Sequence, residues 1–194
     1  RLWLARCYQE AFKPEAAIPL LIAAVEFYSK INNVAYQIIS LGTLGVSYQR
    51  LNQDSLALQA YLQGLELARS INEEVNMAVL YGNIGDSYFA LGQLAEAIKY
   101  YELTAELSRK LNNIRGEVRG KIGVARVKTE IGEFEEAVDL LNDCIVFCKQ
   151  ENYNQGLLLV YNQISQSLIF LGSYEQVIKI NEDLLILAYE MNDL

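Results

Sequence analysis

Seven basic side chains gather in one short stretch of the sequence, residues 109–128. They are seven of the 16 lysines and arginines in a chain of net charge −8, and Glu117 is the one acidic residue among them. The seven are Arg109, Lys110, Arg115, Arg119, Lys121, Arg126 and Lys128. Arg115, Arg119 and Arg126 follow i, i+4 and i+11 spacing, which places them on one face of a helix. Guanidinium groups can hold carboxylates through paired hydrogen bonds, so this face could bind an acidic ligand.

Two interpretations of this basic stretch stay open. It could bind an anionic segment of a partner, or it could be an ordinary solvated face whose charges pair with acids on neighbouring helices. Gly116, Gly120 and Gly123 fall in the same stretch. Each glycine costs a helix about 1 kcal/mol relative to alanine. Such a cost suggests that another helix or a ligand approaches the backbone closely here.

Few other side chains in the sequence could do chemistry. The chain has no histidine, and two of its three cysteines, Cys144 and Cys148, lie four residues apart on one face of any helix. A metal site needs more ligands than these two, so we interpret them as small buried thiols and expect no metal and no other cofactor. We find no glycine-rich phosphate loop and no carboxylate pair in an apolar setting, and therefore expect that the chain is not an enzyme.

Charge and hydropathy argue against two classes of partner. Phosphate binding needs a basic surface, so a net charge of −8 argues against nucleic acid. No apolar run reaches about 18 residues, so we expect no transmembrane helix and no membrane partner. No secretory leader opens the chain, and we expect a cytoplasmic location. The sequence begins at Arg1 within a periodic segment, so we expect it to be a piece of a longer chain.

The elements that must position these side chains repeat every forty residues. Asparagine returns as Asn32, Asn72, Asn112, Asn152 and Asn192, and alanine as Ala17, Ala57, Ala97 and Ala137. The register runs through the whole chain without an insertion. A fixed period in this range is typical of proteins built from stacked repeats.

Each forty-residue unit contains two helical patterns. In the third unit, Leu80, Ile84 and Tyr88 recur at helical spacing, and Gly92 has the position of a C-terminal cap. A second apolar stripe follows and ends just before Asn112. After glycine, asparagine best tolerates left-handed backbone, so we expect each repeated asparagine to turn the chain into the next unit, or else to cap the following helix. We find no strand-like alternation of useful length.

The third unit resembles a tetratricopeptide repeat in its segment YGNIGDSYFALGQLAEAIKYYELTAEL. The residues on the family's first-helix pattern, W-x2-L-G-x2-Y, are Tyr81, Ile84, Gly85 and Tyr88, and those on its second-helix positions are Ala97 and Tyr101. The long period resembles the repeats of kinesin light chains, Pins-type polarity scaffolds and many bacterial regulators. The resemblance covers the chain, although Lys121 and Lys128 replace aromatic residues of the pattern in the fourth unit.

The resemblance implies an all-α fold, a right-handed solenoid of about five antiparallel helix pairs. We expect one array over residues 1–194. Its repeats are expected at about 1–33, 34–73, 74–113, 114–153 and 154–194.

The resemblance also implies a function, because first helices in this family line a concave groove that receives peptides. The residues on groove positions that we expect to bind a peptide are Asn83, Asp86, Phe89, Arg115, Arg119, Arg126, Gln163 and Gln166. Amides can hold peptide backbone and arginines can hold acidic side chains, so we expect a protein or peptide partner with acidic side chains. The alternative function is a regulatory sensor or assembly module of a larger signalling protein.

The last helical pattern raises the question of what covers it. Ile180, Leu184, Leu187 and Met191 recur at helical spacing, and no further helix follows them in the sequence. We expect this apolar face to be open in the isolated array and to be covered by another element, which could be a second copy of the chain.

Overall fold

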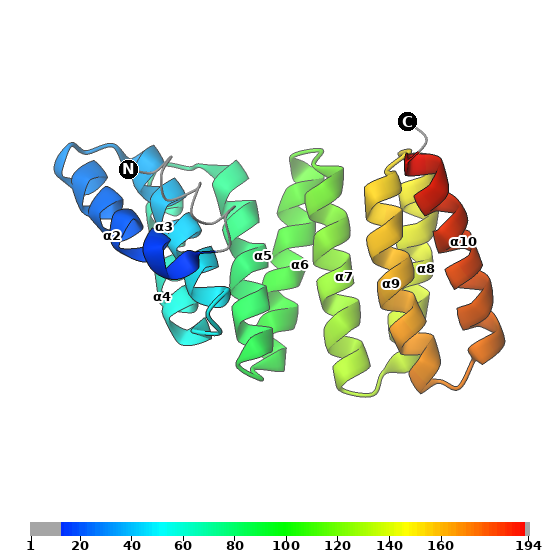
Figure 1. Cartoon of the computed structure of the whole chain (residues 1–194). Coiled ribbons are helices and arrows are strands. Elements are labelled where there is room, and N and C mark those ends of the chain that lie inside the picture. The colour runs from blue at the N-terminus through cyan, green and yellow to red at the C-terminus, as the bar shows by residue number, and fades with distance from the viewer. Residues whose placement is uncertain (1–12, 193–194) are drawn as a thin grey trace. The chain divides into compact units, whose positions relative to one another are not determined.

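The computed structural model describes residues 13–192, and this part of the chain consists of helices joined by short turns. The helices are α2 (Pro14–Lys30), α3 (Val34–Gln49), α4 (Asp54–Ser70), α5 (Glu74–Ala90), α6 (Leu94–Lys110), α7 (Ile114–Glu130), α8 (Phe134–Gln150), α9 (Asn154–Phe170) and α10 (Tyr174–Asn192). Residues 13–192 contain no strand, and helices that follow one another run antiparallel (Figure 1). The predicted all-α repeat fold is therefore confirmed.

The helices form because small and large apolar residues recur at helical spacing. In α8, Ala137, Leu141, Cys144 and Cys148 follow i, i+4, i+7 and i+11 spacing, and each is buried. A stripe of this kind stabilises a helix by packing against its neighbours, because it removes apolar surface from water. The interpretation of the two cysteines as buried thiols is confirmed.

Every turn between two described helices contains one residue with left-handed backbone. These residues are Asn32, Asn52, Asn72, Gly92, Asn112, Gly132, Asn152 and Gly172, with φ between 53° and 88°. The turning role predicted for the repeated asparagines is confirmed at four of the five positions, whereas Asn192 is the last residue of α10. Capping falls to neighbouring residues instead: Asn33 Oδ1 accepts from the Tyr36 N–H at 3.2 Å.

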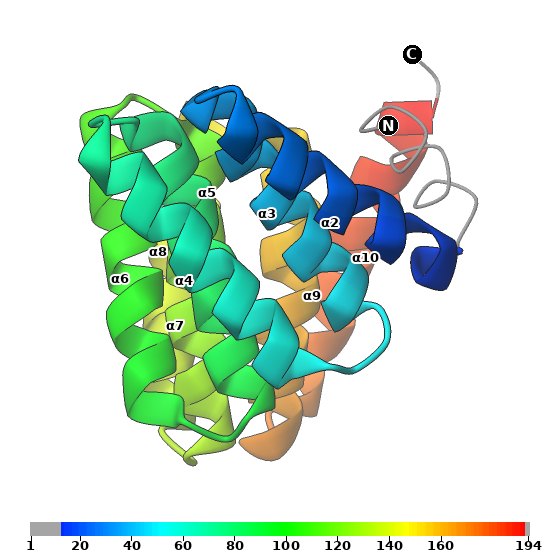
Figure 2. The ribbon, with the colours of Figure 1, turned by 90° about the vertical axis from the view of Figure 1, so that its left-hand side faces the viewer.

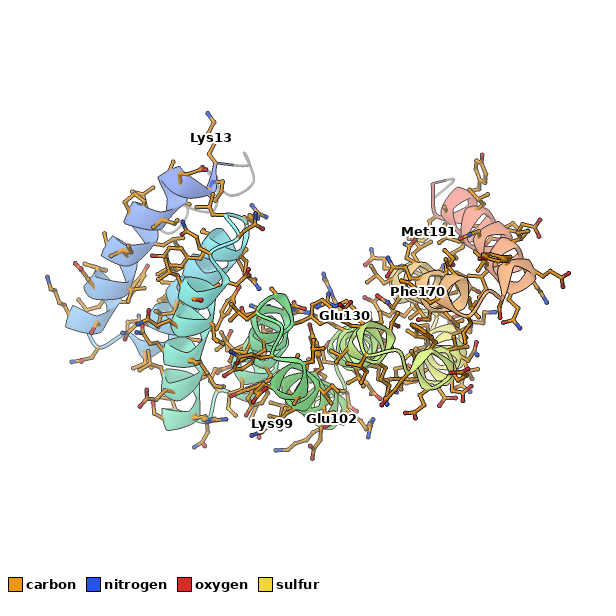
Figure 3. The ribbon with its side chains drawn as sticks, turned by 90° about the horizontal axis from the view of Figure 1, so that it is seen from below. Lys13, Lys99, Glu102, Glu130, Phe170 and Met191 are labelled. Atoms are coloured by element: carbon orange, nitrogen blue, oxygen red, sulfur yellow. The ribbon has the colours of Figure 1, made fainter. Side chains whose placement is uncertain are left out.

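The chain divides into two compact units, Arg1–Tyr100 and Tyr101–Leu194, and the division falls within α6. In the first unit, α3 packs against α2, α4 and α5 (Figure 2). In the second unit, α9 packs against α7, α8 and α10 (Figure 3, with the colours of Figure 1). In each unit, the first helices of two successive pairs therefore lie side by side.

One pair of polar side chains joins these neighbouring first helices in each unit. Gln49 Nε2 donates to Ser87 Oγ at 3.3 Å and joins α3 to α5. Thr129 Oγ1 and Ser167 Oγ lie 2.7 Å apart and join α7 to α9. The two pairs occupy equivalent positions of the register, since each partner is eighty residues from its counterpart. The bond between α7 and α9 helps to fix the spacing of the two helices that carry the candidate site.

The apolar face of α10 does not lie where the sequence analysis placed it. Ile180, Leu184, Leu187 and Met191 pack against the core of the second unit, and Leu187 is only 7% exposed. The prediction that these four residues form an open face is therefore wrong. The physical reason is that α10 uses them to pack against α9 and to bury its own repeat.

Candidate functional site

Helices α7 and α9 form the walls of an open hollow in the second unit. The hollow has a volume of about 330 Å³. It is lined by Arg115, Val118, Arg119 and Ile122 of α7, by Leu159, Asn162, Gln163 and Gln166 of α9, and by Tyr153 in the turn before α9. Four of the eight residues predicted to bind a peptide, two from each helix, thus line one hollow.

The two walls of the hollow carry different polar groups. Arg115 and Arg119 lie one turn apart on α7, and Arg115 is exposed. On α9, Gln163 Nε2 donates to Gln166 Oε1 at 3.3 Å. Gln163 is buried, so its position is set by packing as well as by this bond. The hollow therefore offers guanidinium donors on one side and amide donors and acceptors on the other.

Apolar side chains separate these two polar walls. Val118 is buried, Ile122 is half-buried and Leu159 is largely exposed. The ring of Tyr153 lies so close to Gly156 that a Cβ there would be 2.2 Å from the ring. Glycine at that position therefore allows the ring to reach the hollow.

The eight residues predicted from the sequence leave out five of the lining residues, namely Val118, Ile122, Tyr153, Leu159 and Asn162. For Tyr153 a signal was present, because glycine in the first turn of α9 is unexpected unless something packs against it. For Val118 and Leu159 no signal separated them from ordinary apolar helix residues.

The remaining basic residues of 109–128 divide into different roles. Arg109 Nε and Lys121 Nζ lie 3.1 Å and 2.9 Å from Glu117 Oε1, so these two cations pair with a buried carboxylate. Lys128 pairs with Glu133 and Glu136. The interpretation as charges paired with acids is therefore confirmed for Arg109, Lys121 and Lys128. Arg115 and Arg119 line the hollow, and the binding of an anionic segment there stays a prediction.

The Glu117 carboxyl is charged because of its two partners. Burial raises the pKa of Glu117, but hydrogen bonds from Lys121 and Arg109 outweigh burial, and its pKa lies below the usual value. Lys121 Nζ also lies 4.8 Å from the centroid of the Phe147 ring, at a distance suited to a cation–π contact. The cluster of Arg109, Glu117 and Lys121 is therefore a satisfied structural group.

Arg126 contacts the second helix of the preceding pair. Its Nη2 donates to the hydroxyl of Tyr101, and its guanidinium carbon lies 5.6 Å from the centroid of the same ring. The structure thus brings Arg126 against α6, whereas Arg115 and Arg119 line the hollow between α7 and α9.

The three glycines of α7 face α6. A Cβ at Gly120 would lie 2.6 Å from the carbonyl oxygen of Tyr101, and a Cβ at Gly123 would lie 2.4 Å from the Tyr101 ring. A Cβ at Gly116 would lie 2.2 Å from Ser108 Oγ. The close approach inferred from these glycines is therefore made by a helix of the same chain.

The other three predicted residues belong to the first unit. Asn83, Asp86 and Phe89 lie on α5 at i, i+3 and i+6 spacing, and each is half-buried. Spacing of this kind spreads them over about a third of the helix circumference.

The described part of the chain has neither a group of side chains placed as metal ligands nor a membrane-spanning helix. Residues 13–192 contain no group of three or more histidine, cysteine, aspartate or glutamate side chains placed to hold a metal ion. Burial raises the pKa of the Cys144 thiol to about 12. None of the helices described is long and apolar enough to cross a membrane.

Three solved structures illustrate the likeness of fold. Nearly identical TPR-like repeats of a kinesin light chain type protein from Podospora anserina give a TM-score of 0.78 at 19% identity, over 97% of this chain and 93% of that one. Aspartyl phosphate phosphatase F from Bacillus subtilis gives 0.85 at 13% identity, over 100% of this chain and 51% of that one. A Rap protein in complex with Competence and Sporulation Factor gives 0.74 at 15% identity, over 99% and 63%.

At these identities the likeness shows the fold alone. No curated protein sequence matches the chain. A sequence profile of the tetratricopeptide repeat, in contrast, matches residues 1–70 and 76–150, which together make up more than half of the chain. With its forty-residue register, its antiparallel helix pairs and this match, the chain belongs to the tetratricopeptide repeat family.

Proposed function

We propose that the chain is a protein-interaction module that binds an extended segment of a partner in the hollow between α7 and α9. The observation that carries this proposal is the meeting of Arg115, Arg119, Gln163 and Gln166 around one hollow with an apolar lining between them. An extended segment presents backbone amides and carbonyls along its length, and glutamine side chains can bond both.

The chemistry of the hollow favours a partner segment with acidic side chains. Its lining contains two guanidinium groups and no carboxylate. Arg115 and Arg119 are one turn apart, so their guanidinium groups can hold one carboxylate jointly or two carboxylates on neighbouring side chains. Ile122 and Leu159 then offer contact to an apolar side chain of the same segment.

The family match supports a binding role. Tetratricopeptide repeats generally serve as scaffolds for protein–protein interaction, and this chain belongs to that family. The Rap protein of similar fold was solved in complex with Competence and Sporulation Factor. We extend the proposal to Asn83, Asp86 and Phe89 as contacts in the first unit, and to Arg126 as a contact beyond the hollow.

Selection from a library of random peptides tests the proposal. We expect enrichment of peptides that carry Asp or Glu beside an apolar residue. The double variant Arg115→Glu/Arg119→Glu should bind the enriched peptides at least tenfold more weakly, since a hydrogen bond to a charged group contributes about 1.5–3 kcal/mol.

A control with the same change in net charge separates this effect from general repulsion. Lys99→Glu/Lys149→Glu changes two exposed lysines on second helices and should bind the peptides almost as the unchanged chain does. The proposal is wrong if no sequence is enriched, or if both double variants lose affinity equally.

A further inference from the structure

Helix α10 has a second apolar stripe, on a different side from its core face. Tyr174, Ile178, Leu185 and Tyr189 are 64%, 60%, 56% and 73% exposed. With 3.6 residues per turn, these four side chains fall within about one-sixth of the helix circumference. Large apolar side chains gathered in this way on a surface commonly mark an interaction site.

The register of the repeats shows how this side of a second helix is covered elsewhere in the unit. In α8, Leu141 is buried and Ile145 is half-buried, and both belong to the core that α8 shares with α9. Forty residues later the corresponding residues of α10 are Asn181 and Leu185, which are both exposed. Among the described helices of the second unit, none covers this side of α10 as α9 covers α8.

The outer stripe of α10 is not a copy of the surface that receives α9. Its central position is the polar Asn181, where α8 has the fully buried Leu141. Near its C-terminal end it carries Tyr189, where α8 has Lys149. Compared with α8, the stripe of α10 thus has a polar residue at its centre and an apolar one near its end. A helix that packed on α10 as α9 packs on α8 would therefore bury the Asn181 amide and leave Tyr189 exposed.

The arrangement of the stripe fits a two-fold axis instead. Tyr174 and Tyr189 are equally distant from the midpoint between Asn181 and Glu182, and so are Ile178 and Leu185. An antiparallel α10 helix of a second copy would place Tyr174 opposite Tyr189 and Ile178 opposite Leu185. A face that is complementary to itself in this way is the requirement for a symmetric dimer.

Asn181 and Glu182 both lie beside the axis of such a pair, because the midpoint falls between them. Asn181 Oδ1 accepts a hydrogen bond from Ser165 Oγ at 3.3 Å, which orients the amide from within the same unit. The NH2 group of one Asn181 can donate to the Oδ1 of the other, since a carbonyl oxygen has two lone pairs.

We propose that α10 forms a two-fold symmetric, antiparallel dimer contact with the α10 helix of a second copy of the chain. The contact is one helix wide and about 22 Å long from Tyr174 to Tyr189. It is therefore smaller than a standard interface of about 800 Å² per partner, and we expect a dissociation constant in roughly the micromolar range. The contact is independent of the peptide hollow, which lies between α7 and α9.

Sedimentation velocity over about 1–100 μM protein tests the proposal. The unchanged chain should shift from monomer to dimer, and Leu185→Glu should weaken the dimer at least tenfold. Val146→Glu is the matched control, because Val146 is a 55% exposed residue of the equivalent helix α8 and should leave the dimer intact. Circular dichroism should show that Leu185→Glu is folded, since its side chain is exposed.

Disulfide cross-linking tests the antiparallel geometry. In a chain with Cys7→Ser, one tagged copy carries Ile178→Cys and a differently tagged copy carries Leu185→Cys. We expect cross-links between the two different copies and few between identical ones. A strict monomer, open-ended oligomers, a dimer that Leu185→Glu does not affect, or preferred cross-linking of identical copies would each overturn the proposal. So would a monomer in which the Ile178→Cys thiol resists labelling, because another part of the same chain would then cover the stripe.

Discussion

The third and fourth repeats fill the same position of the register in two different ways. Tyr81 in the third repeat is buried, and its hydroxyl accepts a hydrogen bond from Arg69 Nη2 at 3.4 Å. In the fourth repeat this position is Lys121, whose ammonium pairs with Glu117 at 2.9 Å. The residue one turn earlier changes in step, from Met77 to Glu117.

This difference shows that the basic residues of the fourth repeat do not all have the same role. Arg109 and Lys121 neutralise a buried carboxylate that the third repeat lacks, so their charge serves the fold. Arg115 and Arg119 instead line the hollow together with two glutamines. Charge density alone therefore does not locate a binding site. The partners of each charge must be known.

The largest effect is expected when the residue of the fourth repeat is placed in the third. Tyr81→Lys buries an ammonium close to the Arg69 guanidinium, with Met77 at the position that Glu117 has in the fourth repeat. We expect the free energy of unfolding to fall by about 2–4 kcal/mol in urea denaturation. Tyr81→Phe is the control and should cost about 1 kcal/mol, because it loses one hydrogen bond. Equal stability of the two variants would contradict the interpretation.

Removing the carboxylate of the fourth repeat should have the next largest effect. Glu117→Gln leaves two cations without their charged partner, and we expect a loss of about 1–3 kcal/mol at pH 7. Because the folded pKa of Glu117 is lowered, its contribution is complete above the unfolded pKa of about 4.3. That contribution is lost as the pH falls through the lower folded value.

Denaturation curves from pH 7 to about pH 3 check this pH dependence. The difference in stability between the unchanged chain and Glu117→Gln should shrink as the pH falls below about 4. A difference that stays constant over this range would show that the carboxylate charge is not what stabilises the fold.

A smaller effect is expected when the fourth repeat is converted to the pattern of the third. Glu117→Met/Lys121→Tyr replaces a buried ion pair with apolar packing, which is often neutral or stabilising by about 1–3 kcal/mol. Thermal unfolding should therefore show a melting temperature equal to that of the unchanged chain or higher. If the double variant is less stable than Glu117→Gln, the fourth repeat does not accept the Met and Tyr side chains of the third repeat in place of its ion pair.

The smallest effect is expected at the hollow. Arg115→Ala removes an exposed side chain and should change the free energy of unfolding by less than about 0.5 kcal/mol. The same variant should weaken binding of the peptides selected on the unchanged chain. A loss of stability as large as that of Glu117→Gln would place Arg115 among the structural cations.

Much of the fold could be predicted because the same residue pattern recurs in each forty-residue unit. Asparagine tolerates left-handed backbone, and it recurs every forty residues. The residue type and the period were therefore sufficient to predict the turns at Asn32, Asn72, Asn112 and Asn152. The side of α10 that is buried could not be predicted in this way. That helix has apolar residues on two different sides, and the periodicity of the sequence does not indicate which side packs against α9.

The candidate site was predictable only in its polar part. Arg115, Arg119, Gln163 and Gln166 were selected from their positions on first helices, and the structure places all four around one hollow. Whether a cation lines the hollow or pairs with an acid depends on contacts between helices, as for Arg109 and Glu117. Such contacts join residues on different elements, so the sequence pattern of a single helix does not contain them.

Within each unit, the described helices pack against helices close to them in sequence, and this has a consequence for folding kinetics. Helices α7, α8 and α9 are consecutive, so the candidate hollow is made by one continuous stretch, residues 114–170, and needs no contact with a distant segment. Proteins dominated by such local contacts have low contact order and commonly fold in microseconds to milliseconds. Nucleation can begin within any pair of neighbouring helices and spread from there. A binding surface of this kind can therefore assemble early in folding, before the rest of the array is complete.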